Sequence, residues 1–253
     1  MNVLAVGCHP DDLEIGCGGT LAKYVKQGAK VTMCNVANGN KGHVLIPPDE
    51  LRLIRWKEVQ AGGKVLGVHE NIMLDVGDLR VDSYNLDVVH ALIDVIRHAE
   101  PDLIITHCPQ DYMKDHQEVS KMVFDASFST SCPWETTEKS DGVERPVFAV
   151  PTDLSGSPKF TGIVPIYYMD NLAGVNFLPT EYVDISEEIE QKITALDCHE
   201  SQIVWMRDHD HIDFLDFVRT TSKFRGYQCG VAYAEGFTHC DAWPRIPTKR
   251  LLP

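Results

Sequence analysis

Apolar runs of four to six residues recur along the first half of the chain and are typical of buried strands. These runs cover residues 3–7, 30–35, 71–76 and 103–106. Between them, apolar positions recur at helical spacing. That spacing predicts helices over residues 21–27, 47–66 and 86–98. Strands and helices therefore alternate, and this order predicts an α/β fold: a Rossmann-like, doubly wound, mostly parallel sheet with helices on both faces.

The second half of the chain has weaker periodicity. After a predicted helix over 117–128, residues 129–162 are rich in Ser, Thr, Pro and Gly, as in loops that act as lids or substrate walls. Later patterns predict strands over 163–170 and 182–185 and helices over 186–201 and 209–224. Ser186 is the expected cap of the first of these helices. No repeat or boundary interrupts the pattern, so residues 1–253 are expected to form a single domain.

The composition narrows the partners that the protein is expected to bind. The formal net charge is -14 and the pI about 5.1, which disfavours nucleic acid and anionic membrane surfaces because no basic patch is evident. No run approaches the roughly 18 apolar residues of a membrane span. The first residues lead directly into a strand without a signal-peptide pattern. The eight cysteines are dispersed without a C-x-x-C pair, as in reduced proteins. A cytoplasmic enzyme is therefore expected.

Polar residues with metal-binding chemistry follow the first predicted strand. His9, Asp11, Asp12 and Glu14 fall within six residues, at the carboxyl end of the strand over 3–7, where α/β proteins place their sites. An imidazole and a carboxylate three positions apart can converge on one cation, and both are Zn²⁺ ligands. The alternative is a solvated loop with an acidic first helical turn. The glycines that follow lack the G-x-G-x-x-G spacing of a dinucleotide site.

A second polar loop follows the predicted strand over 103–106 and precedes a predicted helix. It carries His107, Asp111, Asp115 and His116. In a doubly wound sheet, two such loops can meet at the same edge, across the topological switch point. The loop thus holds four groups that can bind a metal or transfer protons. We therefore expect them to share a site with the first loop, and the alternative is that they are isolated surface or capping residues.

The string CHPDDLE at residues 8–14, followed by GCGGT at residues 16–20, resembles the signature of the PIG-L/LmbE-like family of zinc-dependent N-deacetylases. The resemblance implies that His9 and Asp12 bind zinc. It also implies that Asp11, the first acid of the string, is the general base.

The second loop carries the rest of the implied site. In the family it typically ends His-Pro-Asp-His, and the final His is the third zinc ligand. Here the last two positions match, which implies that His116 is that ligand. The first position is Met113, so the family's usual catalytic histidine has no counterpart there. Asp11 and, after it, His107 are then the candidates for delivering a proton to the leaving amine.

The resemblance extends over most of the chain, because residues 192–202 and 225–237 also match later patterns of the family. It further implies substrate-binding roles for Arg55 and Asp78. An arginine at this place could orient a carboxylate or a hydroxyl group bidentately. The alternatives from the residues alone are a surface charge at Arg55 and a turn aspartate at Asp78.

The implied function is a hydrolase that removes an N-acetyl, or short N-acyl, group from an amino sugar or glucosaminyl conjugate. Zn²⁺ would be held by His9, Asp12 and His116, although this donor set also suits Fe²⁺, Co²⁺ or Ni²⁺. The substrate is a small molecule, and family analogy implies a homo-oligomer, often a hexamer. Two alternatives stay open: a metal-dependent hydrolase of a non-amide bond, and a catalytically weakened relative that binds metal and sugar.

Overall fold

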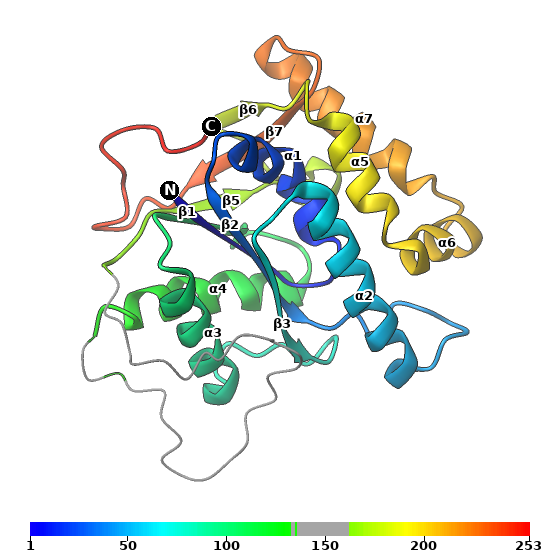
Figure 1. The fold of residues 1–253 in the computed structure, drawn as a ribbon, viewed down its shortest axis with the longest axis horizontal. Helices are drawn as coiled ribbons and strands as arrows, with labels where there is room; N and C mark the ends of the chain where they lie inside the picture. Colours follow the sequence, from blue (N-terminus) through cyan, green and yellow to red (C-terminus); the bar gives the residue numbers. More distant parts are fainter. Residues whose placement is uncertain (133–134, 136–161) are drawn as a thin grey trace.

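One mixed sheet organises the chain in the computed structural model, which describes residues 1–132, 135 and 162–253 (Figure 1). Within these residues, the strands are β1 (Asn2–Gly7), β2 (Lys30–Ala37), β3 (Glu70–Val76), β4 (Leu103–His107), β5 (Ile166–Met169), β6 (Glu181–Asp184) and β7 (Ala234–His239). Residues 133–134 and 136–161, most of the segment expected to form a lid or substrate wall, lie outside the described part.

Parallel pairing dominates the sheet, whose strand order is β3-β2-β1-β4-β5-β7-β6. β1 pairs in parallel with β2 and β4, β2 with β3, and β4 with β5. β7 runs antiparallel to both β5 and β6. The chain moves outward from β1 to β3 and then crosses to β4 on the other side of β1, which creates a topological switch point between β1 and β4. The predicted α/β fold with a mostly parallel sheet is confirmed.

Helices cover both faces of this sheet (Figure 1). The described helices are α1 (Asp12–Lys26), α2 (Pro48–Leu66), α3 (Leu86–Ala99), α4 (Lys114–Ser129), α5 (Ile189–Asp197), α6 (Glu200–His209), α7 (Phe214–Cys229) and the 3₁₀ turn η1 (Leu172–Gly174). Alternate residues of β1 belong to different apolar clusters: Val3 and Ala5 pack with α1 and α5, and Leu4 and Val6 pack with α3 and α4. None of the described helices is long and apolar enough to cross a membrane.

The start of α1 differs from its prediction, whereas the other elements of the first half match within three residues at each end. Glycines at 16 and 19 disfavour a helix by about 1 kcal/mol each, so the sequence predicted a start at 21. The structure has the helix from Asp12 onward. A Cβ atom on Gly16 would lie 2.6 Å from Met169 Sδ, and one on Gly19 would lie 2.8 Å from Ile185 Cγ2. The glycines let α1 pack directly on β5 and beside β6, and this packing outweighs their low helix propensity.

The second half differs more from its predicted elements. The single helix expected over 186–201 is two helices, α5 and α6, and Ser186 caps neither, because its hydroxyl donates to Asp184 Oδ1 at 2.6 Å. The helix expected over 209–224 is shifted to α7, which begins after the capping carboxylate of Asp213. The two later predicted strands are present as β5 and β6. β7 was not predicted, because a six-residue segment with an internal glycine has a weak strand pattern.

A buried ion pair ties α1 to the C-terminal part of the fold. Lys192 of α5 lies 2.6 Å from Glu235 of β7, and its ammonium donates to the backbone carbonyl of Ile15 at 2.7 Å. Glu235 also accepts N–H bonds from Gly19 and Thr20, at 2.9 and 2.7 Å. The pair is therefore inserted beside the hydrogen-bond ladder of α1. It fixes the position of the helix that follows the first polar loop.

Lys192→Met should destabilise the fold by about 3–5 kcal/mol, because it leaves the carboxylate of Glu235 buried without its partner. The loss would appear as a lower midpoint of chemical denaturation. Lys121→Met is the matched control: its partner Asp125 is exposed, so the midpoint should hardly move. Equal midpoints for the two variants would contradict a structural role of the buried pair.

Candidate functional site

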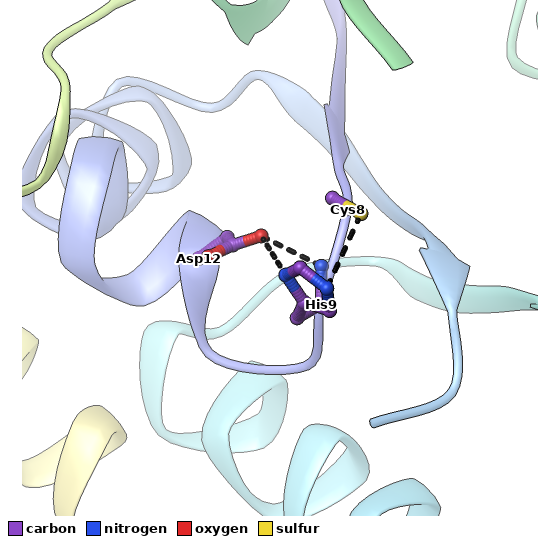
Figure 2. Close-up of side chains that lie close together, drawn as sticks. All are labelled: Cys8, His9 and Asp12. Carbon is purple, nitrogen blue, oxygen red and sulfur yellow. Dashed lines mark hydrogen bonds and ion pairs between the residues drawn. The ribbon is translucent and has the colours of Figure 1, made fainter. Parts of the chain in front are cut away.

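The carboxyl ends of β1 and β4 carry the residues of both polar loops. His9 lies between β1 and α1, Asp12 opens α1, His107 ends β4, and His116 lies in the first turn of α4. All four line a cleft of about 340 Å³ at the switch point of the sheet. Figure 2 shows His9 and Asp12 close together where β1 turns into α1. The structure thus brings the two loops together.

Three donor atoms in the cleft have the mutual spacing of a tetrahedral metal site. His9 Nδ1 lies 3.3 Å from His116 Nε2 and 3.4 Å from Asp12 Oδ2, and His116 Nε2 lies 3.3 Å from the same oxygen. In a tetrahedron, metal–donor bonds of about 2.0–2.1 Å put neighbouring donors about 3.3–3.4 Å apart. Three protein donors also leave one position for water or substrate. These side chains therefore fit a divalent transition-metal ion.

Each imidazole of this triad has a carboxylate near its other ring nitrogen. His116 Nδ1 lies 2.9 Å from Asp111 Oδ2, and His9 Nε2 lies 3.4 Å from Asp115 Oδ2. Both acids also accept a backbone N–H bond, which holds them in place. Such outer carboxylates orient metal-binding histidines and fix which nitrogen is free. The sequence located both acids in the second loop but did not assign them this role.

Asp12 remains ionised despite its burial. Burial alone would raise its pKa, but the charge of His116 and the hydrogen bonds from His116 and His9 lower the pKa well below the usual range. The backbone N–H of His9 also donates to Asp12 Oδ2 at 2.6 Å. An ionised carboxylate is the form that binds a metal.

Cys8 and His107 are poorly placed as metal ligands. Among the described residues, Cys8, His9 and Asp12 form one potential metal-binding group, and Asp12, His107 and His116 form another. Cys8 Sγ lies 3.7 Å from His9 Nε2, whereas the triad uses the other ring nitrogen, Nδ1, so the thiol does not share the triad side of that ring. His107 Nε2 accepts the N–H of Cys8 at 2.9 Å, and burial lowers the pKa of His107 to about 4. A ring nitrogen engaged in this way has no lone pair for a metal.

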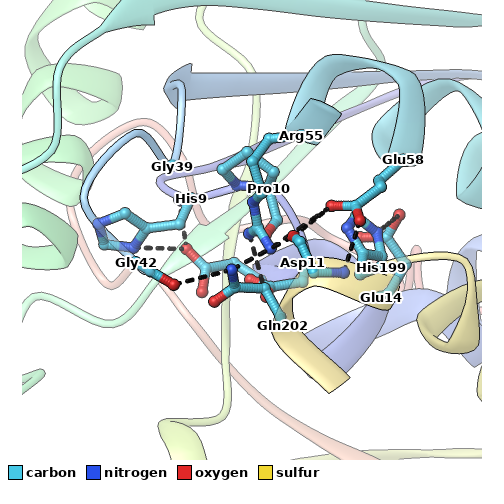
Figure 3. A network of polar contacts seen from close by, with 12 residues as sticks. His9, Pro10, Asp11, Glu14, Gly39, Gly42, Arg55, Glu58, His199 and Gln202 are labelled. Atoms are coloured by element: carbon cyan, nitrogen blue, oxygen red, sulfur yellow. Dashed lines mark hydrogen bonds and ion pairs between the residues drawn. The ribbon is translucent and has the colours of Figure 1, made fainter. Parts of the chain in front are cut away.

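Asp11 lies next to the triad but in a different environment (Figure 3). Its φ of 106° is in the left-handed region, which costs a non-glycine residue about 1–3 kcal/mol. Arg55 is 2% exposed; its Nη2 lies 3.1 Å from Asp11 Oδ2 and donates to the carbonyl of Pro10. Burial raises the pKa of Asp11 to about 6, with the charge of Arg55 opposing the rise. Arg55 therefore contacts the expected base; it also lines the cleft, and its expected contact with substrate stays a prediction.

Asp78 holds the loop that follows β2. Its Oδ1 accepts the N–H of Gly39 and its Oδ2 the N–H of Lys41, each at 2.9 Å. Gly39 has φ 71°, and a Cβ atom there would lie 2.6 Å from Arg55 Nε, so only glycine fits. Asp78 also lines the cleft. Its expected contact with substrate stays a prediction, and the structure adds a role in shaping the cleft wall.

Comparison with known proteins relates these residues to a family. The family model described as PIG-L, GlcNAc-PI de-N-acetylase, matches residues 4–127, which include every candidate site residue named above. The first half of this chain is therefore similar to the PIG-L family. A diacetylchitobiose deacetylase of Thermococcus kodakarensis is 28% identical to the chain over 246 residues, covering 92% of this chain and 81% of that protein.

Solved structures share the fold of this chain. The N,N'-diacetylchitobiose deacetylase from Pyrococcus horikoshii, complexed with its inhibitor MPG, has a TM-score of 0.76 at 25% identity, covering 94% of this chain and 83% of that one. The 4-carboxy-2-hydroxymuconate hydratase GalB from Pseudomonas putida KT2440 has a TM-score of 0.77 at 19% identity, covering 99% and 100%. The second likeness concerns the fold alone. The shared fold therefore does not fix the reaction.

At Met113 this chain differs from the family motif. Met113 precedes α4 and lines the cleft where the motif has an imidazole. A thioether has no proton to donate. His107, the substitute considered from the sequence, has its Nε2 occupied by the N–H of Cys8. Of the groups already considered for proton delivery, Asp11 therefore remains the best placed.

Residues of α6 reach the cleft and were missed by sequence analysis. Gln202 lines the cleft and donates to the carbonyl of Gly42 at 3.1 Å. Ser201 donates its N–H and its hydroxyl to Glu58, at 2.7 and 2.8 Å. Figure 3 shows this network reaching Arg55, whose Nη1 lies 3.9 Å from Glu58 Oε2. Their resemblance to a late PIG-L pattern was the signal that could have found them.

His9→Ala, Asp12→Ala and His116→Ala should each lower the bound zinc from about one ion per chain, because two donors bind a metal far more weakly than three. Elemental analysis of the purified variants measures this loss. His98→Ala is the control, since His98 pairs with Glu70 at 2.8 Å and lines no part of the cleft. If all three donor variants keep stoichiometric zinc, the ligand assignment is wrong.

Proposed function

We propose that this protein is a zinc-dependent hydrolase that removes an N-acetyl group from an amino sugar or glucosaminyl conjugate, with residues 1–253 acting as one domain. The observation that carries the proposal is the triad of His9, Asp12 and His116 at tetrahedral spacing, with Asp11 in the same cleft. The names of the family and its relatives, a GlcNAc-PI de-N-acetylase and two diacetylchitobiose deacetylases, support N-acetylated sugars as the substrate class.

Different residues of the cleft have different roles in amide hydrolysis. His9, Asp12 and His116 would hold a Zn²⁺ ion, which would supply the Lewis acidity to polarise the amide carbonyl and acidify water. Asp11 takes a proton from the attacking water as the water oxygen bonds to the carbonyl carbon. The C–N bond then breaks, and Asp11 returns the proton to the departing nitrogen. The products are a carboxylic acid and a free amine.

Arg55 keeps Asp11 in position for both proton transfers. One guanidinium nitrogen contacts the carboxylate of Asp11 and donates to the carbonyl of Pro10, so it fixes side chain and backbone together. A guanidinium stays charged throughout the working pH range. Asp11 therefore keeps the same electrostatic partner in its protonated and ionised forms. Asp78 supports the same side of the cleft through Gly39 and Lys41, and we propose that its carboxylate also meets the sugar.

Asp11→Asn should lower turnover by about 10²–10⁴, the usual contribution of a general base, while zinc stays bound. Acetate released from N-acetylglucosamine and diacetylchitobiose measures turnover, and elemental analysis measures zinc. Asp12→Asn is the matched control on the neighbouring acid and should lose zinc instead. Loss of zinc in Asp11→Asn would mean that the two acids have been assigned in the wrong order.

The same assay tests the function as a whole. If the zinc-loaded protein releases no acetate from any of a panel of N-acetylated sugars and glucosaminyl conjugates, deacetylation is rejected. Sugar binding without turnover would then favour a binding protein, a reading consistent with Met113 in the cleft. Release of a different product would favour a hydrolase of a non-amide bond.

His107 assists catalysis from a fixed position. Its ring stacks on that of His116 with centroids 3.9 Å apart, and its Nε2 accepts the N–H of Cys8. His107→Ala should lower kcat about tenfold or more with zinc retained, because the His116 ring and the end of β1 lose support. Steady-state kinetics and elemental analysis check both effects. A silent His107→Ala, with turnover raised by orders of magnitude in Met113→His, would instead identify a weakened natural site.

A further inference from the structure

The cleft beside the metal donors has two chemically different walls. The loops after β2 and β3, with α2 and α6, contribute a mainly polar wall of Lys41, Arg55, Asp78 and Gln202, with Leu79 as its one apolar side chain. From α1, the end of β5, η1, α6 and α7 comes an apolar wall of Ile15, Met169, Leu172, Met206 and Phe214. An acetyl group ends in a single methyl, which does not require a wall of this size.

The apolar wall is the edge of one continuous apolar cluster. Met169 and Phe214 belong to the core cluster between the sheet and the helices α1, α5 and α7. Ile15, Leu172 and Met206 are partly buried and pack against that cluster. Apolar surface of this kind gains free energy when a ligand covers it, because water is released. The wall is therefore suited to an alkyl group.

The strand order places the metal donors between the two walls. The polar loops follow β2 and β3, the donors lie at the ends of β1 and β4, and Met169 ends β5. A trans amide is planar, and its substituents on the carbonyl carbon and on the nitrogen point in opposite directions. When the amide lies at the donors, the sugar and the acyl chain therefore point toward different walls. The hydroxyl groups of a sugar match the polar wall, which leaves the acyl chain on the apolar one.

The acid at the edge of the apolar wall is neutralised by a partner. Asp170 lines the cleft, but Arg225 binds it bidentately, with Nε 2.6 Å from Oδ2 and Nη2 3.0 Å from Oδ1. Arg225 is buried and also donates to the carbonyl of Phe177 at 3.2 Å. A bidentate arginine–carboxylate pair has a fixed geometry. An alkyl chain on this wall therefore does not have to desolvate an unpaired carboxylate at Asp170.

We propose that the apolar wall is an acyl-binding site and that the enzyme prefers amino sugars whose N-acyl chain is longer than acetyl. This inference rests on the proposed amide hydrolysis and extends its substrate class. Each additional methylene that leaves water for such a surface gains up to about fourfold in binding. The unbranched thioethers of Met169 and Met206 can adapt to chains of different length.

The test compares kcat/KM of the zinc-loaded protein for glucosamine with N-acetyl, N-butyryl, N-hexanoyl and N-octanoyl groups. We expect at least a tenfold rise from acetyl to hexanoyl. Met206→Gln keeps side-chain length and helix propensity but makes the wall polar, so the hexanoyl-to-acetyl ratio should fall severalfold. Val204→Gln, on the same helix but outside the cleft, is the matched control and should leave the ratio unchanged.

The outcomes separate the acyl site from the proposed function. Equal kcat/KM across the series, with N-acetylglucosamine cleaved, would reject the acyl site and leave deacetylation intact. No turnover of any N-acyl sugar would reject both. Alkyl glycosides of N-acetylglucosamine form a second arm: if a chain on the aglycone raises kcat/KM and a chain on the acyl group does not, the wall binds the aglycone. If kcat/KM still rises steeply with acyl-chain length in Met206→Gln, the apolar wall is not the acyl-binding site.

Discussion

The ionised, largely buried carboxylate of Asp12 is the constraint on which the site depends. Its Oδ2 accepts the N–H of His9 and lies within 3.4 Å of ring nitrogens of His9, His107 and His116. A buried carboxylate is costly unless hydrogen bonds and positive charge surround it. The amino end of α1 supplies part of that charge through the helix dipole. Because α1 begins at Asp12, its positive amino end stabilises the carboxylate of the site. The glycines that follow let the same helix pack closely on the sheet.

The pairing of β1 with β4 brings the two polar loops together although about a hundred residues separate them in sequence. Val6 lies opposite Thr106 in the ladder, and the Thr106 hydroxyl donates to the Val6 carbonyl at 2.8 Å. Where the backbone pairing ends, the Cys8 N–H donates to the ring of His107 at 2.9 Å. Side-chain hydrogen bonds thus extend the strand pairing up to the first metal donor. The spacing of the triad is set by the sheet and by the first turns of two helices.

Local patterns in the sequence were sufficient for the parallel half of the fold, because it lies in contiguous apolar runs, and they located the two polar loops that carry the proposed donors. The apolar runs over 3–7 and 103–106 mark the central strands, and the residues that follow them supply the triad. The roles of Asp111 and Asp115 depend on distances to imidazole rings, which spacing in a loop does not reveal. The apolar wall gathers Met169, Met206 and other side chains from distant segments, and only the tertiary fold brings them together. β7 was missed because its strand character comes from pairing with two antiparallel neighbours.

Asp11 and Asp12 are adjacent in the chain, yet the backbone between them gives them different chemistry. Asp11, at φ 106°, lies against Arg55, whereas Asp12 opens α1 and faces the imidazoles. Burial acts on both carboxylates. At Asp11, the charge of Arg55 offsets the effect of burial only in part, so the pKa rises to about 6. At Asp12, the histidines outweigh the effect of burial and lower the pKa. Opposite shifts suit adjacent acids to different tasks, proton transfer for one and metal binding for the other. The strained backbone at Asp11 is therefore located where it keeps these two carboxylates in separate environments.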